Sequence, residues 1–197
     1  MGFFRTMYRE LRDILGLSPP PENGTQRAAR LCGELKGELG GKRQKSADNY
    51  ALITAYGGRE LTMLFEAEPS RARLAMASEL DPGIVFYVQR DPLAGPSPAG
   101  RGVQRSYVAT GVFLEAADPR ALAAIEAQWK ALPTGARGLI PQILQKNGGD
   151  LEVDGGVVRY TPEAATLEDK SAKYSLKSQL QTLQKIIEGM ESGWGKG

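Results

Sequence analysis

The chain has 197 residues, with 25 lysines and arginines against 23 aspartates and glutamates, one cysteine and no histidine. A net charge of +2 gives no overall field that would attract nucleic acid. The absence of histidine removes the usual general base near neutral pH and the commonest metal ligand. The single cysteine, Cys32, excludes an internal disulfide, and we interpret it as a small buried hydrophobic residue.

The apolar runs of the chain are too short to cross a membrane, because charge interrupts them well before the roughly 20 residues that a spanning helix needs. The first residues carry Arg5, Arg9 and Glu10 inside what would be the apolar region of a secretory signal. We therefore expect a cytoplasmic protein, or one that is peripheral at the inner face of a membrane.

Residues 1–16 predict an amphipathic helix, which ends before Pro19, Pro20 and Pro21. At 100° per residue its apolar side chains fall within an arc of about 140°, with arginines on one flank and Glu10 and Asp13 on the other. A helix that served only its own core would not need a proline-stiffened connector, so this helix is a predicted docking element. Its predicted partner-binding residues are Phe3, Phe4, Met7, Tyr8, Leu11, Ile14 and Leu15 in the stripe and Arg5, Arg9 and Arg12 beside it.

The next segments alternate between helical and β patterns. Apolar spacing predicts a helix over residues 26–39, and "KRQKS" at 42–46 is predicted to be a charged loop. Two β-rich runs joined by Gly57 and Gly58 predict a hairpin. Residues 71–80 alternate like a strand, although a helix stays open, and residues 83–91 predict another strand. Residues 91–102 predict a surface loop, and residues 106–116 one further strand.

The second half predicts three helices and a hairpin. Asp118 as N-cap and Pro119 after it predict a helix over 120–132, and another follows from Pro133 to about 147. Residues 151–160 form a predicted hairpin with its turn at Gly155 and Gly156, and the final helix is expected over 166–192.

The final helix carries apolar residues at heptad spacing. This seam either packs on the domain's own sheet, which we favour, or pairs with another chain. Trp194 extends the spacing into a glycine-rich tail, where we do not expect the helix to continue. The seam residues are Leu176, Leu180, Leu183, Ile187, Met190 and Trp194.

The fold expected from these elements is α+β: an antiparallel sheet of about five to seven strands, with two Gly-Gly hairpins, covered on one face by helices. The expected division is a docking helix at 1–16, a proline-rich connector at 17–25, the α+β domain at 26–165, and a long C-terminal helix with a glycine-rich tail at 166–197.

No catalytic or cofactor motif is present in the sequence. "GELGGKRQKS" lacks the P-loop pattern, and neither Gly-Gly turn fits the dinucleotide fingerprint. The carboxylates Asp150, Glu152 and Asp154 alternate with Leu151 and Val153, which is typical of the solvent face of a strand. We therefore expect no metal site, no cofactor and no catalytic residue.

We do not expect the protein to bind nucleic acid. A basic sheet with exposed aromatic rings can hold a single strand. Acidic residues are interspersed with the basic ones here, so the local field is weak. The residues that suggest such a surface are Arg71, Arg73, Arg90, Arg101, Arg105, Phe86 and Tyr87.

Three function classes remain. The leading prediction is a non-enzymatic interaction protein, an accessory or scaffold subunit of a larger assembly that docks a protein partner through its N-terminal helix. The first alternative is a peripheral membrane protein that uses the same helix. The second is an enzyme or small-ligand module whose pocket the sequence does not show. Packing of the N-terminal helix on its own core also stays open, as does homo-oligomerisation.

Overall fold

The computed structural model describes residues 22–81, 83–90, 104–116, 118–163, 167–168 and 171–194. The predicted docking helix at 1–16 lies outside these residues, as do most of the connector, the loop predicted at 91–102 and the end of the C-terminal tail.

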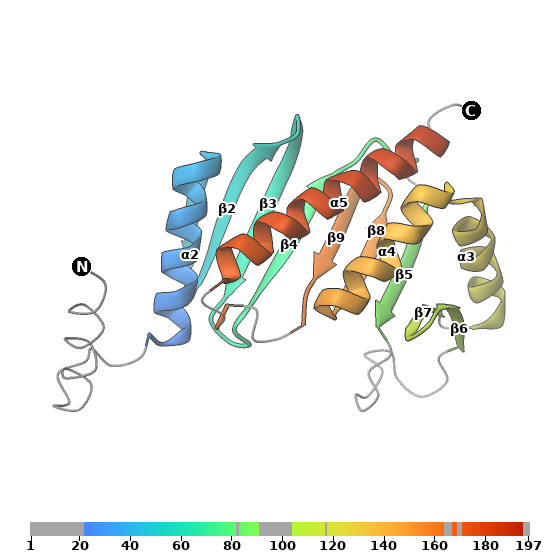
Figure 1. Cartoon of the computed structure of the whole chain (residues 1–197), viewed down its shortest axis with the longest axis horizontal. Helices are drawn as coiled ribbons and strands as arrows, with labels where there is room; N and C mark the ends of the chain where they lie inside the picture. Colours follow the sequence, from blue (N-terminus) through green and yellow to red (C-terminus); the bar gives the residue numbers. More distant parts are fainter. Residues whose placement is uncertain are drawn as a thin grey trace, which may run out of the picture.

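The described residues form an α+β fold with one nine-stranded antiparallel sheet and four helices (Figure 1). The strands lie in the order β1-β2-β3-β4-β9-β8-β5-β7-β6. The helices are α2 (Gly24–Leu39), α3 (Pro119–Ala131), α4 (Thr134–Asn147) and α5 (Ala172–Trp194). The strands are β1 (Lys42–Ser46), β2 (Asn49–Tyr56), β3 (Arg59–Glu66), β4 (Arg71–Ala77), β5 (Val85–Arg90), β6 (Gln104–Ala109), β7 (Val112–Ala116), β8 (Asp150–Asp154) and β9 (Val157–Thr161).

The fold class is confirmed, but the predicted count of five to seven strands is too low. One extra strand is β1, because "KRQKS" is not a loop but the exposed edge strand of the sheet. The other arises because residues 106–116 form two strands, β6 and β7, joined by a turn at Thr110 and Gly111. The segment at 71–77, whose sequence pattern fits a strand or a helix, is strand β4.

The starts of α3 and α4 follow their predicted signals, whereas α5 begins at Ala172, six residues after the expected start at about 166. The side chain of Asn23 accepts a hydrogen bond from the Gln26 amide, so α2 begins two residues before the expected start. Asp118 caps α3 in the same way, and Pro133 precedes α4. Helix α5 continues through Gly193 to Trp194, contrary to the expectation that it would stop before the glycine-rich tail.

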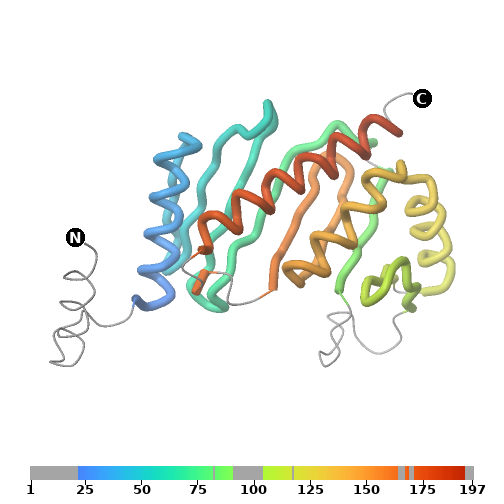
Figure 2. The backbone as a smooth tube through the Cα atoms, viewed as in Figure 1, coloured from blue at the N-terminus to red at the C-terminus, as the bar shows by residue number. Residues whose placement is uncertain are grey.

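One face of the sheet is covered by helices (Figure 1). The tube in Figure 2 shows α5 crossing the middle of the sheet diagonally, with α2 on one side of it and α4 on the other. Alternate strand residues point into this core, for example Leu61, Met63 and Phe65 of β3, which are fully buried. We call this the helix side of the sheet.

Two sets of ion pairs hold α5 in place on the helix side. Arg59, at the start of β3, makes a two-point ion pair with Glu191 near the end of α5, and Glu191 also accepts a hydrogen bond from the Glu79 amide. Near the other end, Lys173 and Lys177 lie 2.8 and 2.7 Å from the carboxylate oxygens of Glu38 on α2. Both ends of α5 are therefore tied to elements that lie far away in the sequence.

Candidate functional site

The opposite face of the sheet carries none of the helices that the structure describes, and we call it the open face. In each strand every second side chain points to the helix side, and the side chains between them point to the open face. Most of these open-face side chains are half-buried rather than exposed. The described helices therefore leave this face of the sheet uncovered (Figure 1).

Cross-strand ion pairs lie in the middle of the open face. Glu66 of β3 accepts hydrogen bonds from Nε of Arg71 at 2.5 Å and Nε of Arg73 at 3.1 Å, both on β4. Arg159 of β9 lies 3.4 Å from Glu152 and 3.2 Å from Asp154, both on β8. These arginines are therefore already neutralised by the sheet's own carboxylates.

An apolar strip lies beside these ion pairs, over β2, β3 and β4. Its side chains are small or β-branched, apart from one leucine, so the surface is low and even. All are half-buried except Ala55, which is exposed. The strip consists of Ala51, Ile53, Ala55, Thr62, Leu64, Ala75 and Ala77.

A carboxylate cluster occupies the other end of the open face. Glu115 of β7 is 7% exposed and accepts hydrogen bonds from Gln89 Nε2 at 3.0 Å and Arg105 Nε at 2.9 Å. Burial raises the pKa of Asp150 on β8, against the lowering effect of a hydrogen bond with Thr161. Burial, with the negative charges of Asp150 and Glu115, also raises the pKa of Tyr87.

The groups of this cluster are paired or have pKa values shifted toward their neutral forms. A raised tyrosine pKa suppresses the phenolate, so Tyr87 is a poor base and nucleophile near pH 7. No group of three or more metal-ligating side chains lies together among the described residues. Asp150 and Glu152 are half-buried and Asp154 is exposed, as a strand's polar face predicts.

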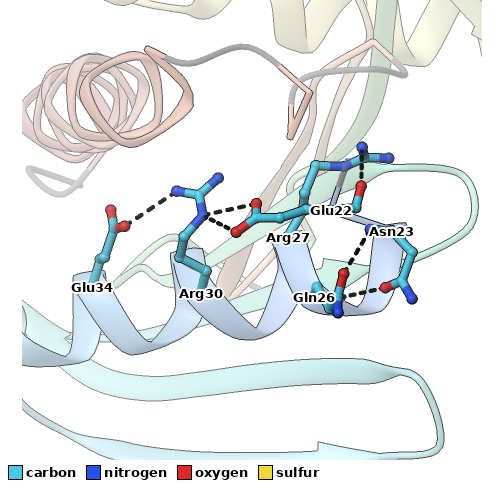
Figure 3. Close-up of polar contacts among 6 residues, drawn as sticks. All are labelled: Glu22, Asn23, Gln26, Arg27, Arg30 and Glu34. Carbon is cyan, nitrogen blue, oxygen red and sulfur yellow. Dashed lines mark hydrogen bonds and ion pairs between the residues drawn. The ribbon is translucent and has the colours of Figure 1, made fainter. Parts of the chain in front are cut away.

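A depression of about 450 Å³ lies at the N-terminus of α2, and two of its polar side chains, Asn23 and Asn49, are hydrogen-bonded within the fold. Asn23 and Gln26 form a reciprocal cap, drawn in Figure 3 with the neighbouring Glu22, Arg30 and Glu34 ion pairs. Asn49 accepts a hydrogen bond from the Ala67 amide at 3.1 Å. The residues that line the depression are Asn23, Gly24, Thr25, Ala47, Asp48, Asn49, Ala67 and Glu68.

The seam residues of α5 lie against the sheet. Leu176, Leu180, Leu183, Ile187 and Met190 are all fully buried in the core of this one chain, so they offer no exposed surface to a partner. Trp194 is the last residue of α5. The ten partner-binding residues predicted between Phe3 and Leu15 lie outside the described residues.

The described residues that suggested a nucleic-acid surface do not lie together as a basic sheet surface with exposed aromatic rings. Phe86 is buried on the helix side, where its ring lies edge-on to Trp129 with centroids 6.1 Å apart. Arg90 lies 3.7 Å from Glu163, and Arg105 is paired with Glu115. Arg101 lies outside the described residues. Of the aromatic pair, only Tyr87 lies on the open face, and it is half-buried.

Sequence reasoning missed the basic edge strand β1 and the open face as surfaces. The edge strand has no apolar alternation, because all five of its residues are exposed. The open face depends on which distant strands pair, and cross-strand neighbours such as Ala75 and Arg159 are not readable from local patterns.

Comparisons with known proteins show a fold but no family. No family model matches the chain, and no curated protein matches it. No helix of the described residues is long and apolar enough to span a membrane. The crystal structure of the mycobacterial trehalose monomycolate transport factor A, TtfA, is similar, with a TM-score of 0.53 at 9% sequence identity. The match covers 84% of this chain and 93% of that one, and it shows a shared fold alone.

Proposed function

We propose that the chain is a non-enzymatic interaction protein, an accessory subunit that docks a protein partner through the apolar stripe of its N-terminal segment. The observation that carries this proposal is the division of the sheet into two sides. The four described helices already cover the helix side, and the α5 seam is used up in that core. The apolar stripe from Phe3 to Leu15 lies outside the described residues and adds, in the sequence, a further set of apolar side chains to those of this core.

Two further observations support the proposal. Around Tyr87 on the open face, Glu115 is paired with Arg105, and burial raises the pKa values of Asp150 and Tyr87 toward their neutral forms, an arrangement compatible with a binding surface. TtfA is named as a transport factor, and that name is compatible with an accessory role. The cytoplasmic location expected from the sequence stays a prediction.

The test changes the stripe in the full chain. Leu11→Asp combined with Ile14→Asp places two charges in the stripe, and the polar-flank substitution Glu10→Gln is the matched control. Both proteins are expressed with an affinity tag, and co-purifying proteins are quantified against wild type. We expect the stripe variant to lose a defined partner that the control keeps, with the same thermal midpoint in both.

Two outcomes contradict the proposal. A loss of cooperative melting in the stripe variant means that the stripe belongs to the protein's own core. The second outcome combines two results: the variant keeps all partners of wild type, and wild type, but not the variant, sediments with anionic vesicles in a salt-sensitive way. These results would mean that the stripe lies on a membrane surface instead.

A further inference from the structure

The β1 edge of the sheet is regular and open. All five residues of β1 pair with β2 in unbroken register, and all five are exposed. The opposite edge, β6, carries a register shift between Tyr107 and Ala109, and such irregularities blunt an edge against further pairing. Of the two edges, β1 is therefore the one with an unbroken ladder, and its lysines and arginine disfavour a strand of like charge but not an acidic one.

The turn geometry determines which backbone groups of β1 face outward. Ser46 and Asn49 flank a two-residue turn, so they form a hydrogen-bonded pair, and such pairs alternate along an antiparallel ladder. Gln44 therefore pairs toward β2, whereas the N–H and C=O groups of Arg43 and Lys45 point away from the sheet. These two residues present the donors and acceptors that an added strand would use.

Neither of these two residues is in an ion pair with any residue that the structure describes. The ion pairs among the described residues include neither Arg43 nor Lys45 nor Lys42, although they include every described arginine of strands β3, β4, β5, β6 and β9. The Arg43 guanidinium lies 4.3 Å from the centroid of the Tyr50 ring and Lys45 Nζ lies 5.8 Å from it. The ring holds both cations on the same face of the sheet.

These charges select the occupant. A second copy that paired through β1 would place cations opposite cations, which is unfavourable. Phosphates of lipids or nucleic acids would contact the two cations but would not use the outward N–H and C=O groups of Arg43 and Lys45 as a row, which would stay hydrated. An extended peptide satisfies both kinds of backbone group, and acidic side chains two residues apart would stand opposite the two cations.

We infer that β1 is a docking edge for an extended acidic segment of a protein partner, which adds as a tenth strand and places two acidic residues, spaced i and i+2, opposite Arg43 and Lys45. The inference rests on the proposed interaction function and names the kind of segment that a partner would contribute. It concerns a surface separate from the N-terminal stripe, so the two are tested independently.

The test uses a fluorescein-labelled peptide of about seven residues in which valine and glutamate alternate, a length typical of a strand. Its binding to the full chain is followed by fluorescence anisotropy, and the amide signals of residues 42–46 are followed by NMR. We expect saturable binding, weakened by salt, with slowed exchange of the Arg43 and Lys45 amides. The same peptide N-methylated at alternate residues cannot pair along the edge and should not bind.

The matched variants change charge equally. Arg43→Glu with Lys45→Glu should weaken binding about tenfold or more and should gain binding to a peptide with lysine in place of glutamate. Lys130→Glu with Lys185→Glu makes the same change in net charge on exposed positions of α3 and α5 and should bind as wild type. The stripe variant at Leu11 and Ile14 should also bind the peptide normally.

Several results overturn the inference. Equal binding of the N-methylated peptide shows attraction by charge without strand addition. No change at Arg43 and Lys45 at about 1 mM peptide shows that the edge does not pair. A third result is that wild type does not bind the peptide but binds anionic vesicles or single-stranded DNA, and that the Arg43 and Lys45 variant loses this binding. The edge would then be assigned to those ligands. In each case the stripe experiment still decides the proposed function separately.

Discussion

The two faces of the sheet are built from the same strands but by different physical means. The helix side is a continuous apolar core, in which neighbouring residues such as Leu74 and Met76 are buried under helices. The open face balances half-buried small residues with cross-strand ion pairs and a carboxylate cluster. Apolar burial therefore stabilises the fold mainly on the helix side, and we expect substitutions on the open face to cost less.

The largest expected contrast comes from adding charge to each face. Leu180→Asp with Leu183→Asp buries two carboxylates without partners in the helix-side core, at a cost of several kcal/mol. We expect aggregation or loss of the cooperative thermal transition. Leu64→Asp on the half-buried open face should stay folded with a modestly lower midpoint, because water reaches the site. A double variant that melts normally would show that the seam is not core.

The next contrast concerns the ion pair that ties α5 to the hairpin of β2 and β3. Glu191→Gln leaves the Arg59 guanidinium, whose side chain is 17% exposed, without its carboxylate. The expected cost is about 1–3 kcal/mol in the free energy of unfolding, measured by urea denaturation. Glu38→Gln, at the more exposed pairs with Lys173 and Lys177, should cost less. A larger loss of stability for Glu38→Gln than for Glu191→Gln would contradict the importance of the ion pair between Arg59 and Glu191.

The pH dependence of stability tests the effect of burial on Asp150 of the open face. Because burial raises its pKa in the folded state above about 3.8, the folded protein binds more protons than the unfolded one between these pKa values. Its contribution to stability therefore falls as pH rises through that window. Asp150→Asn should raise the thermal midpoint at pH 7, and the gain should shrink toward pH 4. An equal gain at both pH values would show that ionisation of Asp150 is not its cause.

The smallest effect is expected at the turn that begins the edge hairpin. Ala47 has a φ of 51°, in the left-handed region that an alanine adopts only at a cost. Ala47→Gly should therefore stabilise the protein by about 0.5–1 kcal/mol, or leave it unchanged if the greater freedom of the unfolded glycine offsets the gain. Thermal melting beside Ala55→Gly, where β2 should be weakened, provides the control. A clear destabilisation by Ala47→Gly would contradict the turn geometry.

The sequence predicts elements wherever a face or a turn leaves a local signal. The Gly57-Gly58 and Gly155-Gly156 hairpins are confirmed, because alternation and turn glycines coincide. The start of α3 is predicted from its cap at Asp118, whereas the cap of α2 at Asn23 was missed and the helix was expected from residue 26. Strand β1 gave no alternation because neither of its faces is buried, and a single glycine at 111 did not reveal the turn between β6 and β7.

The candidate surfaces were harder to predict than the elements. The stripe from Phe3 to Leu15 is visible because helical periodicity is local. The pairing of Arg159 with Glu152 follows from a predicted hairpin, but the approach of Arg105 to Glu115 depends on the missed turn between β6 and β7. The proximity of Asp150 to Tyr87 depends on the pairing of β5 with β8, which are separated in the sequence by β6, β7, α3 and α4. Non-local strand order is the step that local patterns do not supply.

The central claim is that the N-terminal stripe contacts another protein rather than the chain's own core. The most direct measurement is photo-crosslinking in cells with a benzoyl-phenylalanine in place of Leu11, beside one in place of the exposed Tyr174 on α5. We predict a discrete crosslinked product between this chain and a second protein from position 11 and none from position 174. Crosslinks from position 11 only to this chain's own sheet or helices would contradict the account.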